Sequence, residues 1–171
     1  MKKRIALTII TLALLTVAFT QFSWAEEEWL NISIYGVTLT LPSGWVPLKE
    51  KMGFSEKEAA WYKGDVANPD QFLIMARGAE VTSFLELFMG DETEGSELIK
   101  DTKITLGGKE ARSVTMKNSK RDVSLWFIVA DKVFDDGEGI FLNITTQNKS
   151  YDKFLPILQK ALESITFEGT K

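Results

Sequence analysis

Two short runs of alternating apolar and polar residues near the start of the chain predict a β-hairpin. Residues 30–34 and 37–41 each alternate, and Gly36 lies between them. A strand with this period has one apolar face, and glycine accepts the positive φ of a tight hairpin turn. Pro42 ends the second strand because it has no N–H to donate, and Trp45 follows where its ring can fold back over the hairpin. We expect this hairpin to lie on a core as the first hairpin of the main sheet.

Two strands and a loop are predicted next. Residues 58–63 and 71–79 have strand character, and the segment between them, residues 64–70, is rich in turn formers. In residues 71–79 apolar side chains fall on both faces, which is typical of a strand that is covered on both sides. The polar segment 47–57 before these strands is predicted to be a loop or a short irregular helix.

A run of hairpins follows in the second half of the chain. The predicted strands are residues 101–106, 109–117, 122–134 and 139–147. The turns between them are Gly107-Gly108, residues 118–121 and residues 135–138. The third of these strands has apolar residues on both faces, with Val123, Leu125, Phe127 and Val129 on one and Trp126, Ile128 and Ala130 on the other. This strand is therefore predicted to be central in the sheet.

A helix is predicted between the two groups of strands. Ser83 and Glu86 have the spacing of a capping box, which places the start of the helix at Ser83. Residues 84–89 are apolar nearly all round, so we expect the helix to be buried on the sheet rather than to bind a partner or lie on a membrane. The acidic residues 90–97 are expected to end it as a solvated loop.

The chain ends in a second predicted helix. Apolar residues recur at helical intervals between Phe154 and Ile165. Beyond the first turn, Pro156 would remove a hydrogen bond and clash with the carbonyl four residues earlier, so we expect the regular helix to run from near Lys153 or Phe154 to Ser164. Two-faced strands and two apolar helices together predict an α+β domain, an antiparallel sheet with helices on both faces.

The N-terminal segment has the pattern of a bacterial signal peptide. Basic residues 2–4 precede an uncharged run over residues 5–25, and residues 23–25 place small side chains at the positions that a signal peptidase reads. We expect cleavage after Ala25, a periplasmic or secreted location, and no membrane span in the mature chain. The alternative is an uncleaved anchor, because the uncharged run is also long enough to cross a bilayer. Residues 26–171 have the size of one domain.

Charge and composition exclude several kinds of site. All 24 acidic residues lie after Ala25 and three of the 20 basic residues lie before it, so cleavage changes the net charge from −4 to −7. An acidic domain repels phosphate, so nucleic acid is not an expected partner. The chain has no Cys and no His, which excludes disulfides, a lipid-modified cysteine, Cys–His and Ser–His–Asp catalysis, and the usual zinc sites. No catalytic residue and no cofactor is predicted.

Carboxylates remain as candidates for chemistry. Asp135, Asp136 and Glu138 around Gly137 can offer oxygens to Ca²⁺, but the EF-hand spacing is absent and the same residues make an ordinary hairpin turn. They are weak candidates for a metal site. The acidic residues 92–97 are interpreted as part of a solvated loop. Four tryptophans are candidates for a ligand groove, although packing in the core or at its rim is the expected role: Trp29, Trp45, Trp61 and Trp126.

Both ends of the predicted domain resemble one known family. Residues 36–50, GVTLTLPSGWVPLKE, resemble the N-terminal strand of the PsbP-like family of extrinsic photosystem II subunits and of its bacterial DcrB-like relatives, and residues 151–167 resemble the terminal helix and strand. The residues that carry the resemblance are Gly36, Pro42, Trp45, Phe154 and Pro156. The resemblance implies an α/β/α sandwich and a non-enzymatic accessory or binding role, without implying a photosynthetic one. Metal sites of some family members use histidine, so they do not carry over.

Three functions are consistent with these features. The leading hypothesis is an exported, non-enzymatic accessory or binding protein of the cell envelope that has a protein partner. The first alternative is a carrier of a small apolar ligand or lipid, with the helix at residues 84–89 as its lid. The second alternative is a small hydrolase that uses carboxylates, with Asp135, Asp136 and Glu138 as its best candidates.

Overall fold

The computed structural model describes residues 28–89 and 95–168. The predicted signal peptide, residues 1–25, lies outside the described residues. In chain order the elements are β1 (Trp29–Ile34), β2 (Val37–Pro42), β3 (Val46–Leu48), β4 (Lys57–Asp65), β5 (Asn68–Gly78), α2 (Val81–Met89), β6 (Ser96–Leu106), β7 (Lys109–Asn118), β8 (Val123–Ala130), β9 (Gly139–Gln147), the 3₁₀ turn η2 (Asn148–Ser150), α3 (Tyr151–Glu163) and β10 (Thr166–Phe167). No helix among these residues is long and apolar enough to cross a membrane.

The strands form two antiparallel sheets. The large sheet has the order β3-β4-β5-β9-β8-β7-β6, and the small sheet has the order β1-β2-β10. The predicted hairpin with its turn at Tyr35 and Gly36 exists, and both turn residues have positive φ. Its predicted place in the main sheet is wrong, because the free edge of β2 pairs with Thr166 and Phe167 of β10 instead. The first two strands and the last strand of the described residues thus form a sheet of their own.

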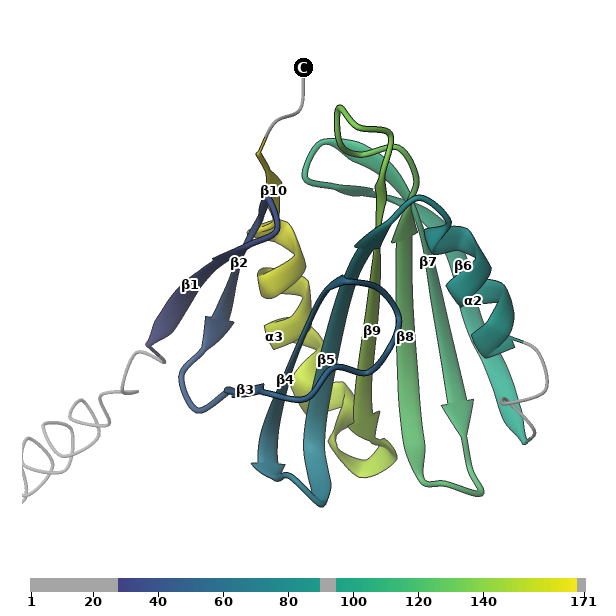
Figure 1. Cartoon of the computed structure of the whole chain (residues 1–171). Helices are drawn as coiled ribbons and strands as arrows, with labels where there is room; N and C mark the ends of the chain where they lie inside the picture. The colour runs from purple at the N-terminus through teal and green to yellow at the C-terminus, as the bar shows by residue number, and fades with distance from the viewer. Residues whose placement is uncertain (1–27, 90–94, 169–171) are drawn as a thin grey trace, which may run out of the picture.

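Each face of the large sheet has its own apolar cluster. One cluster joins Val81 and Leu85 of α2 to inward residues of the central strands, and the other joins α3 and β2 to the opposite face. Figure 1 shows α2 on one side of the large sheet and α3, together with the β1–β2 hairpin, on the other. The α+β class with an antiparallel sheet is confirmed. The prediction that helices cover both faces of the large sheet is incomplete, because on one face α3 shares the cover with the small sheet.

The faces of the two-sided strands are as the sequence predicts. In β8, Phe127 and Val129 belong to the cluster under α2, whereas Ile128 and Ala130 belong to the cluster under α3. The strand lies between β7 and β9, inside the sheet. The alternation therefore identified both the burial and the central position of this strand.

Several predicted boundaries between Pro47 and Leu106 are wrong. The segment expected to be a loop from Pro47 begins within strand β3, which tolerates proline because it lies at the edge of the sheet. Most of residues 64–70, expected to be a turn, pairs as strand across β4 and β5 with a register shift at Lys63 and Gly64. Strand β6 begins at Ser96 rather than residue 101, so the last two residues of the predicted acidic loop are strand. The rest of that loop, residues 90–94, lies outside the described residues.

Both helices begin earlier than predicted. Ser83 is inside α2, which begins at Val81, so a capping box with Ser83 as its N-cap is wrong. Helix α3 begins at Tyr151 and keeps Pro156 in its interior. Phe154 and Leu158 of α3 are almost fully buried, and their burial offsets the hydrogen bond that proline removes.

The family-like motifs at the two ends of the domain meet in the core. Trp45 is 7% exposed, and its ring stacks on Phe154 with 5.8 Å between ring centroids. Pro42 is the last residue of β2, as predicted. The tryptophan after the strand therefore anchors the start of the domain to its last helix.

A buried carboxylate organises the loop between β3 and β4. Glu58 accepts hydrogen bonds from the backbone N–H groups of Met52, Gly53 (3.0 Å), Phe54 (2.6 Å) and Ser55 (3.1 Å). Burial raises the pKa of Glu58, but the four N–H donors together lower it more, so the pKa lies below its ordinary value of 4.5. The loop is wrapped around a carboxylate that stays ionised.

Glu58→Gln is expected to lower the free energy of unfolding by about 2 kcal/mol at neutral pH, because N–H groups lose a charged acceptor. Folding lowers the pKa of Glu58, so the ionised carboxylate stabilises the protein at pH values above the ordinary pKa of 4.5. This stabilisation is lost as the pH falls through the pKa of the folded protein. Urea unfolding at about pH 7 and about pH 3 should therefore show a difference between wild type and variant that shrinks in acid. Glu56→Gln, at an exposed neighbour, is the control. An equal difference at both pH values would contradict this role.

Candidate functional site

The predicted carboxylates at the turn after β8 are paired with cationic side chains. Arg77 donates from Nη2 to Asp136 Oδ2 at 2.5 Å and from Nε to Glu138 Oε2 at 2.5 Å, and Lys57 Nζ lies 2.6 Å from the same Glu138 oxygen. The Glu138 N–H and then Arg77 hold the pKa of Asp136 below its ordinary value. A cation would have to displace Arg77 and Lys57. Asp135, Asp136 and Glu138 as cation ligands stay a prediction, and no cluster of three or more potential metal ligands is found in the described residues.

This ion cluster connects the two sheets. Arg77 Nη1 donates to the Tyr35 carbonyl at 2.7 Å, and the guanidinium lies 3.6 Å over the Phe134 ring. Tyr35 belongs to the turn of the β1–β2 hairpin, whereas Arg77 belongs to β5 of the large sheet. The cluster therefore has a clear structural role.

A different region of the large sheet has open surface on both faces. Helix α2 packs mainly on β5, β8 and β9, and α3 packs on β2 and β9. The hairpin formed by β6 and β7 is not among the elements on which either helix mainly packs. Each face of this hairpin consequently borders a groove, one beside α2 and one beside α3.

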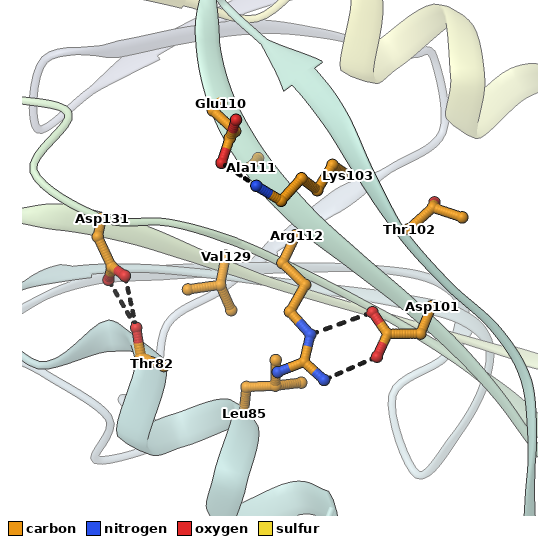
Figure 2. A pocket seen from close by; sticks show the side chains of 10 residues that line it. All are labelled: Thr82, Leu85, Asp101, Thr102, Lys103, Glu110, Ala111, Arg112, Val129 and Asp131. Carbon is orange, nitrogen blue, oxygen red and sulfur yellow. Dashed lines mark hydrogen bonds and ion pairs between the residues drawn. The ribbon is translucent and has the colours of Figure 1, made fainter.

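The groove beside α2 is charged. It has a volume of about 500 Å³ and lies between α2, the β6–β7 hairpin and the end of β8. Its lining residues are Thr82, Leu85, Asp101, Thr102, Lys103, Glu110, Ala111, Arg112, Val129 and Asp131. Figure 2 shows Asp101, Lys103, Glu110 and Arg112 on the β6–β7 hairpin and Asp131 on the segment after β8, and Lys103 pairs with Arg112 in the register of the hairpin.

The charges of this α2-side groove are satisfied within the protein. Arg112 binds Asp101 through two hydrogen bonds, of 3.1 Å from Nε and 2.7 Å from Nη2. Lys103 Nζ lies 2.9 Å from Glu110 Oε1, and Thr82 donates to Asp131 at 2.7 Å (Figure 2). The hydrogen bond from Arg112 lowers the pKa of Asp101, which keeps it ionised. A ligand must compete with these pairs, and Asp101 is unsuited to act as a general acid.

The groove beside α3 is mostly neutral. It has a volume of about 430 Å³ and lies between α3 and strands β6, β7 and β8. Its lining residues are Lys100, Thr102, Ile104, Thr105, Ser113, Thr115, Trp126, Tyr151, Leu155, Gln159, Leu162 and Glu163. Trp126 donates from Nε1 to Ser113 Oγ at 2.6 Å, which fixes the orientation of the indole ring. The α3-side groove combines a fixed aromatic ring with hydroxyl groups.

The polar groups of the α3-side groove are uncommitted. Within residues 28–89 and 95–168, no side-chain hydrogen bond is found for Thr102, Thr105, Thr115, Tyr151 or Gln159. Thr115 is 6% exposed as a whole residue, and its hydroxyl oxygen, which has no hydrogen-bond partner among the described residues, is reached by solvent. The groove therefore offers hydrogen-bonding groups that the protein itself does not use.

Sequence reasoning identified only part of this groove. Of the four candidate tryptophans, Trp126 lines it, whereas Trp45 and Trp61 are core residues with 7% and 5% exposure. Trp29 lies outside it, under the ammonium of Lys160. The alternating hydroxyls of β6 and β7 were visible in the sequence, but their meeting with α3 depends on strand order.

Comparison with known proteins identifies the fold. No protein-family model matches the sequence. No curated protein matches it either. Among solved structures, cyanobacterial PsbP (CyanoP) from Synechocystis sp. PCC 6803 superposes with a TM-score of 0.60 at 14% identity, covering 85% of this chain and 95% of CyanoP.

Two other structures superpose over similar lengths. The Saccharomyces cerevisiae Ran-binding protein Mog1p gives a TM-score of 0.53 at 11% identity, covering 84% of this chain and 97% of Mog1p. LpqN of Mycobacterium tuberculosis, which is involved in cell envelope biogenesis, gives 0.52 at 16% identity, covering 82% and 91%. The PsbP-like resemblance of the two chain ends is confirmed at the level of the fold.

Proposed function

We propose that this protein is an exported, non-enzymatic accessory protein of the cell envelope that binds a protein partner along the outer edge of β6. The observation that carries the proposal is the exposed edge of this eleven-residue strand, which ends the order of the large sheet. Among the described residues, no strand pairs with that edge. A free edge is a template for an extended segment of another protein, because its N–H and C=O groups lack strand partners.

Side chains at the start of β6 support the same proposal. Leu98 and Ile99 are 51% and 53% exposed, and Ile99 occupies a bulge in the pairing with β7. Two large apolar side chains beside a free strand edge favour protein contact. Lys100 and Lys103, which follow on the same strand, oppose unspecific pairing between copies.

Two alternatives have weaker support. The carrier alternative needs an apolar cavity, but the apolar space beneath α3 among the described residues is about 10 Å³, room for at most one water molecule. Leu85 of the proposed lid is fully buried against the sheet. The hydrolase alternative needs a proton donor near neutral pH, whereas Glu58, Asp101 and Asp136 have lowered pKa values.

Export is part of the proposal and is supported by residues 1–25. A basic start, an uncharged run and small residues at Ser23 and Ala25 are typical of a cleaved signal. LpqN, one of the structural neighbours, is involved in cell envelope biogenesis, which agrees with this location. N-terminal sequencing of the protein recovered from the envelope is the direct check, and a first residue of Glu26 is the expected result.

Photocrosslinking tests the partner surface. A photoreactive amino acid at Ile99 in the full chain, irradiated in living cells, is expected to crosslink one protein through one extended segment of that partner. The same residue at Val66, which is 59% exposed in the turn between β4 and β5, is the matched control. Mass spectrometry identifies the crosslinked segment. Equal products from both positions, or none from Ile99, would overturn the edge of β6 as the partner surface.

A further inference from the structure

We propose that the α3-side groove binds a neutral glycan chain, by stacking a sugar ring near Trp126 and by hydrogen bonds to the surrounding hydroxyls. This inference rests on the groove itself and does not depend on the protein partner proposed above. It concerns a face of the sheet, whereas the partner surface is a strand edge.

The first step is the charge of the groove. Its lining contains one cation, Lys100, and one anion, Glu163, and neither forms an ion pair within the described part of the chain. The remaining polar lining consists of hydroxyls and one amide. A lining with no net charge gives no advantage to phosphate, to a polyanion or to a cation. The ligand class that matches it is neutral and polar.

The second step is the match between hydrogen-bonding groups. Hydroxyls of Thr102, Thr105 and Thr115 each donate and accept, and the amide of Gln159 does both through separate atoms. Sugar hydroxyls also donate and accept, and each can rotate to suit its neighbour. The Thr115 hydroxyl has no hydrogen-bond partner among the described residues and can both donate to and accept from a ligand hydroxyl.

The third step is the aromatic ring. Trp126 is partly exposed in β8, and its N–H already donates to Ser113. The ring therefore offers the ligand an apolar face in a fixed orientation, with little conformational entropy to lose on binding. A pyranose ring presents C–H groups on its faces and hydroxyls around its edge. Such a ring can contact the indole while its edge reaches Thr115.

The fourth step separates a glycan from a peptide. The floor of the groove is formed by β6, β7 and β8, which are joined by two ladders with a bulge at Ile99 between β6 and β7. A peptide on that floor would bring one N–H and one C=O per residue, and the backbone groups that pair between these strands are not free to bind them. Sugars carry no such fixed backbone groups. The paired floor consequently favours a glycan over a peptide.

The dimensions of the groove agree with a short oligosaccharide. Its volume of about 430 Å³ lies within the range of roughly 300–1,000 Å³ that small-molecule sites have. It follows α3 from Tyr151 to Glu163, a path of about 18 Å at a helical rise of 1.5 Å per residue. A linear oligosaccharide can lie along this path with several rings in contact.

The test is titration of the protein, purified after expression of the full chain, with maltohexaose, cellohexaose and chitohexaose. At least one of them is expected to change the tryptophan fluorescence and to shift the NMR signal of the Trp126 indole N–H. Trp126→Ala is expected to weaken that binding at least tenfold, and the nearly isosteric Thr115→Val at least threefold. Trp29→Ala, which removes a tryptophan outside the groove, should leave the affinity unchanged.

Three outcomes would overturn the proposal. One is the absence of any binding of the three oligosaccharides at millimolar concentration by the folded wild-type protein. Another is binding that persists unchanged in both Trp126→Ala and Thr115→Val. The third is a shift of the Trp126 signal by an uncharged hexapeptide of alanine, serine and glycine but by none of the sugars. Photocrosslinking at Ile99 is unaffected by these results, so failure here and failure of the partner surface are distinguishable.

Discussion

Replacing Phe141 with alanine is expected to lower the free energy of unfolding by about 3–5 kcal/mol, the largest effect of any single truncation proposed for this chain. Phe141 has 0% exposure, and its ring lies 6.0 Å from Phe54, 5.7 Å from Phe84 and 6.2 Å from Phe127, measured between centroids. These partners belong to the β3–β4 loop, α2 and β8. Truncation would leave a cavity where three segments meet.

Urea unfolding of Phe141→Ala and of two companion variants measures this effect. Phe141→Leu keeps most of the apolar volume and is expected to cost roughly 1 kcal/mol. Leu98→Ala removes an apolar side chain that is 51% exposed, so the change in unfolding free energy should stay within about 0.5 kcal/mol. A loss below about 1 kcal/mol for Phe141→Ala would show that α2 and the loop can collapse into the space.

Arg77→Met is expected to cost about 2–3 kcal/mol of unfolding free energy, because it removes a guanidinium that three acceptors share. The side chain of Arg77 is 14% exposed, whereas those of Asp136 and Glu138 are 46% and 23% exposed. Both carboxylates would keep their charge and lose this partner, and the Tyr35 carbonyl would lose its donor. Methionine keeps the apolar stem of the side chain, but the contact of the guanidinium with the Phe134 ring is lost as well.

Arg112→Met is the matched control for Arg77→Met. Arg112 also binds a carboxylate through two hydrogen bonds, but its side chain is 45% exposed and that of Asp101 is 34% exposed. Solvent screens such a pair, and the expected loss is below about 1 kcal/mol. Denaturant midpoints of the two variants measure the comparison. Equal losses would mean that the link between the two sheets contributes nothing beyond an ordinary surface pair.

Periodicity predicted the parts of the fold whose two sides have different surroundings. The alternation in β8 predicted its position inside the sheet and the direction of its side chains. Successive apolar side chains of this strand contact the two apolar clusters in turn, one on each face of the sheet. The turns at Tyr35-Gly36 and Gly107-Gly108 followed from the need for positive φ. Both features depend on near neighbours in the sequence, and for that reason they can be read from it.

Features that depend on distant pairing were not predicted. The small sheet exists because β2 pairs with β10, and no local pattern distinguishes that partner from a strand of the large sheet. Pro156 predicts a later start for α3 than the observed one at Tyr151, because the burial of Phe154 and Leu158 that favours the helix depends on tertiary contacts. In both cases tertiary packing decided between locally reasonable choices.

In the candidate site, too, features set by near neighbours in the sequence could be predicted, whereas features set by distant contacts could not. Asp136 and Glu138 were found as an acidic turn, but their partner Arg77 is 59 and 61 residues away in the sequence. Thr102 and Thr115 have the appearance of ordinary solvent-facing strand residues until α3 is placed beside them. The sequence supplied the side chains, and the strand order and the position of α3 supplied the groove.

The pairing of β2 with β10 also sets an order of events for folding. The Thr40 N–H donates to Ser164 Oγ across 124 residues of sequence, and Thr166 pairs with Thr38. The small sheet therefore cannot close until nearly the last residue of the domain has been synthesised. Contacts of such long range slow folding, because the chain must first lose the entropy of a large loop. If the protein is exported as proposed, a precursor that cannot complete its fold early would have more time to pass through a translocon.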